Sequence, residues 1–163
     1  RLELDVNKVD KDHHDHFLNG AIFEVYDKTL DKYVTTLASG QLMIIGDSPD
    51  EEYEIAKDED FTKIVKKVKT DENKKIILDI DDGTYYSRKS GSDEVTKHVS
   101  KDGKAVLSDA IYGHEYEFKE IKAPTSYQLA DKTKAYKVEA DEETDTIIYY
   151  FENARIVVPN TGV

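Results

Sequence analysis

The chain contains no cysteine among its 163 residues. This absence excludes disulfide bonds, thiolate nucleophiles, cysteine-ligated zinc and the cysteine-based thioester of some surface adhesins. A chain of this length buries one sizeable core, so we expect a single domain with elaborations.

Basic residues and long apolar runs are also scarce. Lys and Arg number 23 against 35 Asp and Glu, which gives a net charge of −12 at pH 7. A protein without a basic surface cannot displace the counterions of a nucleic acid, so nucleic acid is not an expected partner. No apolar run approaches the length of a membrane span, and no signal peptide precedes Arg1. We therefore expect a soluble chain, trimmed at both ends, without a membrane segment.

The residues that are present alternate between apolar and polar over most of the chain and are rich in Val, Ile, Thr and Tyr. This period of two predicts half-buried strands. We expect strands over residues 2–9, 21–26, 33–37, 41–45, 75–80, 84–88, 96–99, 105–107, 115–121, 135–140 and 146–151. Many short strands separated by turns favour a β-sandwich or a barrel.

Two segments depart from this alternation and predict helices. Over residues 58–69, four apolar residues recur at helical spacing, namely Phe61, Ile64, Val65 and Val68. We expect the lysines of this segment to face solvent. A second, short helix is predicted over 49–56, because Ser48 and Glu51 are spaced as in a capping box.

Three predicted strands carry a polar residue on their apolar face. Lys8 continues the apolar face of the first strand, Glu120 that of the strand at 115–121, and Asn153 that of the last strand. Burial disfavours charged groups, so we expect the three to lie together as a neutral amine, a neutral acid and an amide. A neutral amine is a nucleophile, and a protonated acid polarises an amide carbonyl and carries protons. Lys8 could therefore attack the amide of Asn153, with Glu120 assisting and ammonia leaving, to form an isopeptide bond.

Four motifs follow one another in a characteristic order. They are VNKVDKD at 6–12, NGAIFEVYD at 19–27, SKDGKAVLSDAIYGHEYEFKEIKAPTSYQLA at 100–130 and FENAR at 151–155. In this order they resemble the Cna B-type (SpaA-type) domains of Gram-positive pilins and surface adhesins. The specific match is the family's E-box, Y-x-F-x-E-x-x-A-P-x-x-Y. The chain departs from it at Thr125 and Ser126, where a glycine is usual, and by a long insertion at about 46–95.

The resemblance implies an immunoglobulin-like (Cna B-type) β-sandwich over residues 1–155. The helices predicted from the residue spacing make the insertion a helical segment. The resemblance makes Lys8 the amine, Asn153 the amide acceptor and Glu120 the catalytic acid that shuttles protons, the trio that the strand alternation also singles out. We expect no cofactor and no turnover of an external substrate, because this chemistry is a single reaction of the chain with itself. By analogy with a disulfide that closes a loop of similar size, the bond would add roughly 5 kcal/mol of stability. It would also carry pulling force through covalent bonds.

The tail at 156–163 contains VPNTG, which resembles the LPXTG sorting signal of Gram-positive sortase substrates. The resemblance implies cleavage between Thr161 and Gly162, with Thr161 then bonded to peptidoglycan or to a neighbouring pilin subunit. We therefore expect a secreted protein that is anchored to the cell wall as a stalk or pilin, with sortase as a partner.

Other interpretations of these residues remain open. Lys8 could extend its amine to solvent at a strand end, Glu120 could cap a turn, and Asn153 could simply end a strand. A group of histidines and aspartates could bind a metal, but it falls in a predicted turn, where polar residues are expected; these are Asp10, Asp12, His13, His14, Asp15 and His16. The acidic stretch at 79–83 faintly resembles a calcium loop but lacks EF-hand spacing.

Two alternative functions also follow from the sequence. The chain could be an adhesin that binds a host protein or glycan through the insertion, with its Tyr85, Tyr86 and basic helix, and an exposed apolar patch there would favour this function. A hydrolase using His98 or His114 would need a convergent polar pocket, and no nucleophile motif accompanies either residue.

Overall fold

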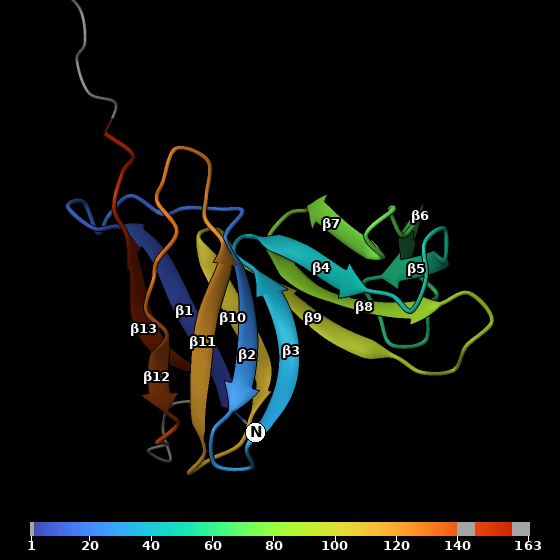
Figure 1. Ribbon diagram of the computed structural model, residues 1–163. Coiled ribbons are helices and arrows are strands. Elements are labelled where there is room, and N and C mark those ends of the chain that lie inside the picture. Colours follow the sequence, from blue (N-terminus) through green and yellow to red (C-terminus); the bar gives the residue numbers. More distant parts are fainter. Residues whose placement is uncertain (1, 140–145, 158–163) are drawn as a thin grey trace, which may run out of the picture.

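The computed structural model describes residues 2–139 and 146–157, and all regular elements in these ranges are strands (Figure 1). They are β1 (Leu2–Asp10), β2 (Ile22–Asp27), β3 (Lys32–Ala38), β4 (Gln41–Ile45), β5 (Glu52–Ala56), β6 (Ile64–Lys69), β7 (Lys75–Asp79), β8 (Gly83–Lys89), β9 (Thr96–Ser100), β10 (Lys104–Ala110), β11 (Glu115–Lys122), β12 (Lys134–Lys137) and β13 (Thr146–Asn153). The expected predominance of β structure is confirmed. No helix long and apolar enough to cross a membrane is found in the described ranges.

Two sheets form a β-sandwich, with strand orders β10-β1-β13 and β12-β11-β2-β3. Between them lies the main core, whose members include the buried side chains of Leu4, Val6, Phe23, Phe118 and Phe151. Each of these side chains comes from the inward face of an alternating strand, as the period of two predicts.

The first and last strands lie side by side. β1 pairs antiparallel with β10 on one edge and parallel with β13 on the other, with Leu4 opposite Ile147 and Lys8 opposite Phe151. Parallel neighbours cannot be joined by a tight turn. Here the part of the chain that contains β2 to β12 forms the connection between β1 and β13.

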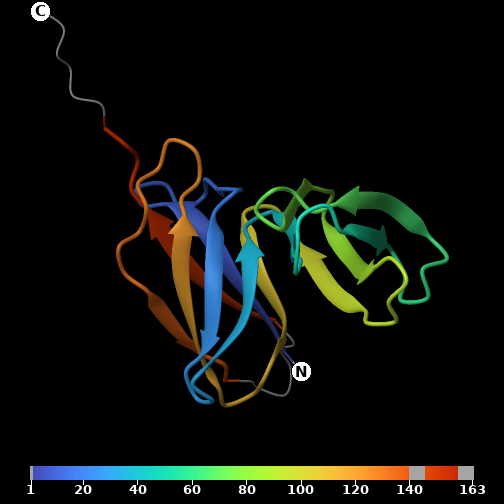
Figure 2. The ribbon, with the colours of Figure 1, turned by 45° about the vertical axis from the view of Figure 1, so that its right-hand side comes forward.

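Strands β4 to β9 form a second, smaller body beside the sandwich, which we call the insertion lobe (Figures 1 and 2). It consists of a two-stranded sheet, β4-β7, and a four-stranded sheet, β6-β5-β8-β9. It has its own cluster of buried side chains, formed by Leu42, Ile44, Ile55, Ile76 and Tyr85. The lobe is therefore packed around a core of its own.

The predicted helix at 58–69 is wrong. The segment forms a turn followed by β6, an edge strand that pairs with β5. Asp58 closes the turn by accepting hydrogen bonds from Thr62 and Lys63, and Phe61 adopts a φ of 56°, which no right-handed helix permits. The apolar spacing misled because residues four apart share a face in a strand as well as in a helix. Lysines on an edge strand discourage pairing with other chains.

The predicted helix at 49–56 is also wrong, although its capping signal is real. The Glu51 carboxylate accepts hydrogen bonds from the backbone N–H and the hydroxyl of Ser48, which is half of a capping box, while the Glu51 N–H donates to the hydroxyl of Thr70 and not to Ser48. Asp50, however, has a φ of 60°, and β5 begins at the next residue but one. The motif caps a turn, because β5 gains strand partners on both sides, β6 and β8. An inserted helical segment is thus replaced by sheet.

The other predicted strands are confirmed, with ends that shift by a few residues. The largest differences are at 105–107, where β10 extends from Lys104 to Ala110, and at 135–140, where β12 ends at Lys137 and residue 140 lies outside the described part of the chain.

Candidate functional site

The three polar residues singled out in the sequence lie together between the two sheets. The exposed fractions of Lys8, Glu120 and Asn153 are 0%, 3% and 1%. Lys8 Nζ lies 3.6 Å from Glu120 Oε2, and Asn153 Nδ2 donates a hydrogen bond of 2.7 Å to Glu120 Oε1. One carboxyl group therefore bridges the amine and the amide.

Strand register explains this meeting. Lys8 on β1 is opposite Phe151 on the parallel strand β13, and Asn153 follows two residues later on the same face. Glu120 comes from β11 in the facing sheet, at a register shift next to β2. The amine and the amide thus share one sheet, and the carboxyl group approaches from the other.

The amine of Lys8 is held in an unusual environment. It donates a hydrogen bond of 2.8 Å to the backbone carbonyl of Phe151 and lies 4.8 Å from the centre of the Phe151 ring. Burial lowers the pKa of Lys8 to about 8, and the charge of Glu120 opposes this shift. A larger fraction of this amine is therefore neutral at physiological pH than of a surface lysine.

The amide of Asn153 has a defined orientation. Its Nδ2 donates both to Glu120 Oε1 and, at 2.9 Å, to the backbone carbonyl of Gln128. A backbone carbonyl only accepts hydrogen bonds, so the nitrogen and not the oxygen must face it. The backbone N–H of Ala130 donates to the same Glu120 oxygen at 2.9 Å.

Two oxygen atoms in this cluster have no hydrogen-bond donor within the described part of the chain. They are Asn153 Oδ1 and Glu120 Oε2, and both are buried. Buried polar atoms without a hydrogen bond are rare and costly, and in a native protein they call for a functional explanation. The cluster thus combines an amine, an amide and a carboxyl group that contacts the nitrogen atoms of both.

Sequence reasoning missed the contributions of Phe151, Gln128 and Ala130 to this site. Gln128 and Ala130 act through backbone groups, and Phe151 acts through its backbone carbonyl as well as its ring. Every residue type carries these backbone groups, so the sequence contains no signal for the contacts that they make.

The histidine and aspartate turn after β1 has a structural role. Asp10 Oδ1 accepts hydrogen bonds from the backbone N–H groups of Asp12 and His13, which closes the turn, and His14 Nε2 lies 2.8 Å from Glu152. In residues 2–139 and 146–157 no three His, Asp or Glu side chains are grouped closely enough to hold a metal ion.

The acidic stretch at 79–83 joins strands. Asp79 accepts a hydrogen bond from Gln41 of the paired strand β4, and Asp82 accepts one from the backbone N–H of Asp102.

His98 and His114 lie in separate parts of the molecule. His114 Nδ1 is 2.7 Å from Asp27 in the sandwich. His98 Nε2 is 2.7 Å from the hydroxyl of Ser87 in the insertion lobe, and burial lowers the pKa of His98 to about 4. Across the described ranges no carboxylate hydrogen-bonds to His98, and Ser87 is itself buried, so the pair lacks the orienting acid and the open nucleophile of a hydrolase.

The predicted cleavage position, Thr161 and Gly162, lies outside the described residues.

Comparison with known families identifies part of the chain. Residues 86–155 match the SpaA family, described as a prealbumin-like fold domain. The match covers 70 of the 163 residues. The resemblance drawn from the sequence motifs is thereby confirmed over a segment that includes Glu120 and Asn153.

No curated protein matches the chain in sequence. Among solved structures it is similar to the minor pilin GBS52 of Streptococcus agalactiae (19% identity, 99% of this chain, 47% of that chain, TM-score 0.38). It is also similar to the pilus 2b backbone protein of group B streptococcus (17%, 94% and 40%, TM-score 0.39) and to domains D2 and D3 of the major pilin SpaD of Corynebacterium diphtheriae (18%, 94% and 46%, TM-score 0.36). The chain spans about half the length of these structures or less.

Proposed function

We propose that this SpaA-type domain is a structural stalk or pilin domain of a Gram-positive cell-surface protein, stabilised by an intramolecular isopeptide bond between Lys8 and Asn153. One observation carries the proposal. The two oxygens of the buried Glu120 carboxyl group face two different nitrogens, Oε2 the amine of Lys8 and Oε1 the amide of Asn153.

This arrangement suits an acyl transfer. The side-chain acyl group of Asn153 passes from its amide nitrogen, which leaves as ammonia, to the amine of Lys8. The neutral amine of Lys8 attacks Cγ of Asn153, and the new N–C bond forms as the carbonyl opens to a tetrahedral intermediate. The Glu120 carboxyl group takes up the proton that Nζ loses, and the same carboxyl group delivers a proton to Nδ2 as the intermediate collapses. The C–N bond then breaks, ammonia leaves, and Nζ keeps one hydrogen as an amide N–H. The lowered pKa of Lys8 supports the first step, because only the neutral amine attacks.

The reaction is a single event for each molecule. The reacting groups are all part of the chain and are buried in the core, so the chemistry changes the protein itself and turns over no external substrate. The bond would link two neighbouring strands and close almost the whole domain into a loop. By the chain-entropy estimate for a cross-link of this size, it would add roughly 5 kcal/mol to the free energy of unfolding.

Attachment to the cell surface forms the second part of the proposal. Its support is the VPNTG sequence at 158–162. A sortase would cleave between Thr161 and Gly162 and join Thr161 to an amine of peptidoglycan or of a neighbouring pilin subunit. Incubation with a sortase and a short glycine peptide tests this: the parent chain should exchange its Gly162-Val163 end for the peptide, and a Thr161→Ala variant should not.

The intact mass of the purified chain tests the isopeptide bond. The parent should be lighter than its sequence mass by one ammonia, about 17 Da, because covalent bond formation changes the mass. The Lys8→Ala variant should show the full mass, as should Glu120→Gln, which keeps the shape of the side chain without its proton transfer. A full sequence mass for the parent chain would remove the isopeptide bond from the proposal.

A second candidate function is ligand binding by an adhesin, and a groove favours it. The groove has a volume of about 480 Å³ and lies between β3 of the sandwich and the insertion lobe. It is lined in part by Tyr33, Thr35, Tyr53 and Thr96, side chains that suit a glycan. Tyr85 is not available for this role, since it is buried in the core of the lobe. Screening the chain and a Tyr33→Ala variant against glycans tests the candidate, which requires binding that the substitution weakens.

A further inference from the structure

The loop between β11 and β12, residues 123–133, runs along the chain that leaves β13 (Figure 2). The backbone N–H of Gln128 donates to the carbonyl of Ala154 at 2.8 Å, and the N–H of Ile156 donates to the carbonyl of Ser126 at 3.0 Å. Tyr127 and Arg155 form a β-bridge between these contacts. The loop is therefore attached to the residues that directly follow Asn153.

This attachment brings the carbonyl of Gln128 to the amide of Asn153. Both hydrogens of Nδ2 are donated, one to Gln128 and one to Glu120. If the amide turned over, its oxygen would face two acceptors and lose both hydrogen bonds. The loop thus decides which atom of the amide faces the carboxyl group, and it selects the nitrogen that must leave as ammonia.

A buried hydrogen bond fastens the same loop to β1. The hydroxyl of Tyr127 donates to Asp10 Oδ2 at 2.8 Å, and both side chains are buried. The N–H of Asp12 and the hydroxyl of Tyr127 lower the pKa of Asp10, so the acceptor is an ionised carboxylate. Asp10 is opposite Asn153 in the strand register and follows Lys8 on the same strand. The loop that orients the amide is therefore tied to the strand that carries the amine.

The turn that presents Tyr127 is itself constrained. The N–H of Tyr127 donates to the carbonyl of Pro124 at 3.1 Å, and Ser126 has a φ of 72°. This is the left-handed region that favours glycine, which explains why a glycine is usual here in the family. The backbone of Ser126 is held in this conformation by the hydrogen bonds of the turn and by the one from the Ile156 N–H to the Ser126 carbonyl.

We propose that Tyr127 and Asp10 are positioning residues for the isopeptide reaction, and this inference rests on the function proposed above. Their hydrogen bond holds the carbonyl of Gln128 against Nδ2 of Asn153, so that the leaving nitrogen faces the acid that protonates it. Neither residue exchanges a proton or forms a bond in the reaction. Their effect is on the rate at which the bond forms.

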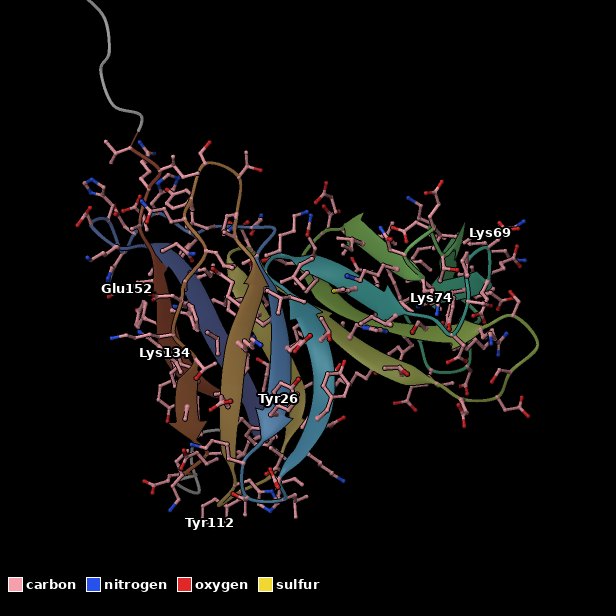
Figure 3. The ribbon with its side chains drawn as sticks, viewed as in Figure 1. Tyr26, Lys69, Lys74, Tyr112, Lys134 and Glu152 are labelled. Atoms are coloured by element: carbon pink, nitrogen blue, oxygen red, sulfur yellow. The ribbon has the colours of Figure 1, made fainter. Side chains whose placement is uncertain are left out.

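The rate of bond formation in a Tyr127→Phe variant tests this role. Full-length chain is taken from synthesis directly into denaturant, diluted into refolding buffer, and sampled with time by intact-mass spectrometry. We expect the variant to reach the same final loss of about 17 Da, roughly tenfold more slowly than the parent, because a hydrogen bond to a charged group is lost. The control is Tyr26→Phe, which removes a tyrosine hydroxyl bonded to the Glu24 carboxylate on β2, toward the end of the sandwich opposite this loop (Figure 3).

Two further measurements separate positioning from general loosening of the fold. An Asp10→Asn variant keeps an acceptor for Tyr127 and should retain most of the parent rate, whereas Asp10→Leu should be as slow as Tyr127→Phe. The pH at which the rate is half-maximal should stay the same in Tyr127→Phe, since Lys8 remains buried. A shift of this pH toward the pKa of an ordinary lysine would instead indicate loosening of the fold and overturn the inference.

A Tyr127→Phe rate equal to that of the parent would overturn the inference as well. If the two rates are equal and both proteins show the mass deficit, the isopeptide bond stands and only the positioning role of Tyr127 and Asp10 is overturned. If the parent shows no mass deficit, the isopeptide bond and the positioning role are both overturned.

Discussion

A fully buried lysine is destabilising unless something offsets the loss of hydration. In the part of the chain that the structure describes, the amine of Lys8 meets a carboxylate at 3.6 Å, one backbone carbonyl and the ring of Phe151. The proposed reaction removes this cost for good, because an amide carries no charge. The cost of burying the amine in the unlinked chain is thus the condition that makes the amine reactive.

The rate of isopeptide formation should depend on pH with a midpoint near 8. Lys8 attacks only when neutral, and its pKa is lowered to about 8 by burial. Below that pH the neutral fraction falls tenfold for each unit, so the rate should fall in proportion, and above it the rate should level off. The mass deficit of freshly refolded chain, followed with time from pH 6 to pH 10, measures this profile. A rate that does not change over this range would contradict an attacking amine at this site.

Much of the site could be predicted from the alternation of residues alone. Lys8, Glu120 and Asn153 each occupy a strand position where an apolar residue is expected. Because buried polar groups are costly unless they contact one another, three of them in one core are expected to lie together. Their geometry could not be predicted, because the carbonyls of Phe151 and Gln128 that orient the amine and the amide are backbone groups. The Tyr127 to Asp10 hydrogen bond joins residues 117 positions apart and depends on loop placement.

At the scale of elements, the insertion lobe shows where local signals mislead. The motif at Ser48 describes a real local arrangement, a closed turn, whereas the apolar spacing after Asp58 does not, because Ile64 and Val65 are neighbours on strand β6 and both are exposed. Neither could reveal that β5 would gain two strand partners and that Ile55 would be buried in the core of the lobe. Propensity and capping are weak signals compared with pairing and burial in a sheet.

The lobe should respond to core damage separately from the sandwich. Ile55→Ala removes a fully buried side chain from the cluster around Leu42 and Tyr85, which should cost about 2–5 kcal/mol within the lobe. Hydrogen exchange should show faster opening of β4 to β9, while the strands of the sandwich keep their protection and the mass deficit still forms. Ile77→Ala, at a half-exposed position on β7, is the control and should change little. Loss of the cross-link in Ile55→Ala would show that the two bodies fold as one unit.

For the whole molecule, the parallel pairing of β1 with β13 decides how the chain meets tension. Force applied to the two ends pulls these neighbours in opposite directions along their length, so all the hydrogen bonds between them resist together. With the proposed bond in place, the load would pass along β1 to Lys8 and leave through Asn153. The residues between these two positions, the insertion lobe included, would bear none of it.

Single-molecule stretching through the two ends should therefore separate the parent from Lys8→Ala. The parent should lengthen only by its short end segments. The variant should release the chain between residues 8 and 153 when it unfolds, about 140 residues or roughly 500 Å at ~3.5 Å for each residue. Asn153→Ala should behave like Lys8→Ala, and equal lengthening of parent and variants would contradict the proposed load path.

The ring that the proposed bond between Lys8 and Asn153 closes also affects resistance to proteases. Loops with many polar residues are the usual sites of nicking, and most of the loops of this protein lie between Lys8 and Asn153. In a linked molecule a single cut anywhere in that stretch opens a ring without releasing a fragment, so the two ends of the chain stay covalently joined through the side-chain amide. A fibre built from such units would keep its continuity after damage that divides an ordinary domain in two.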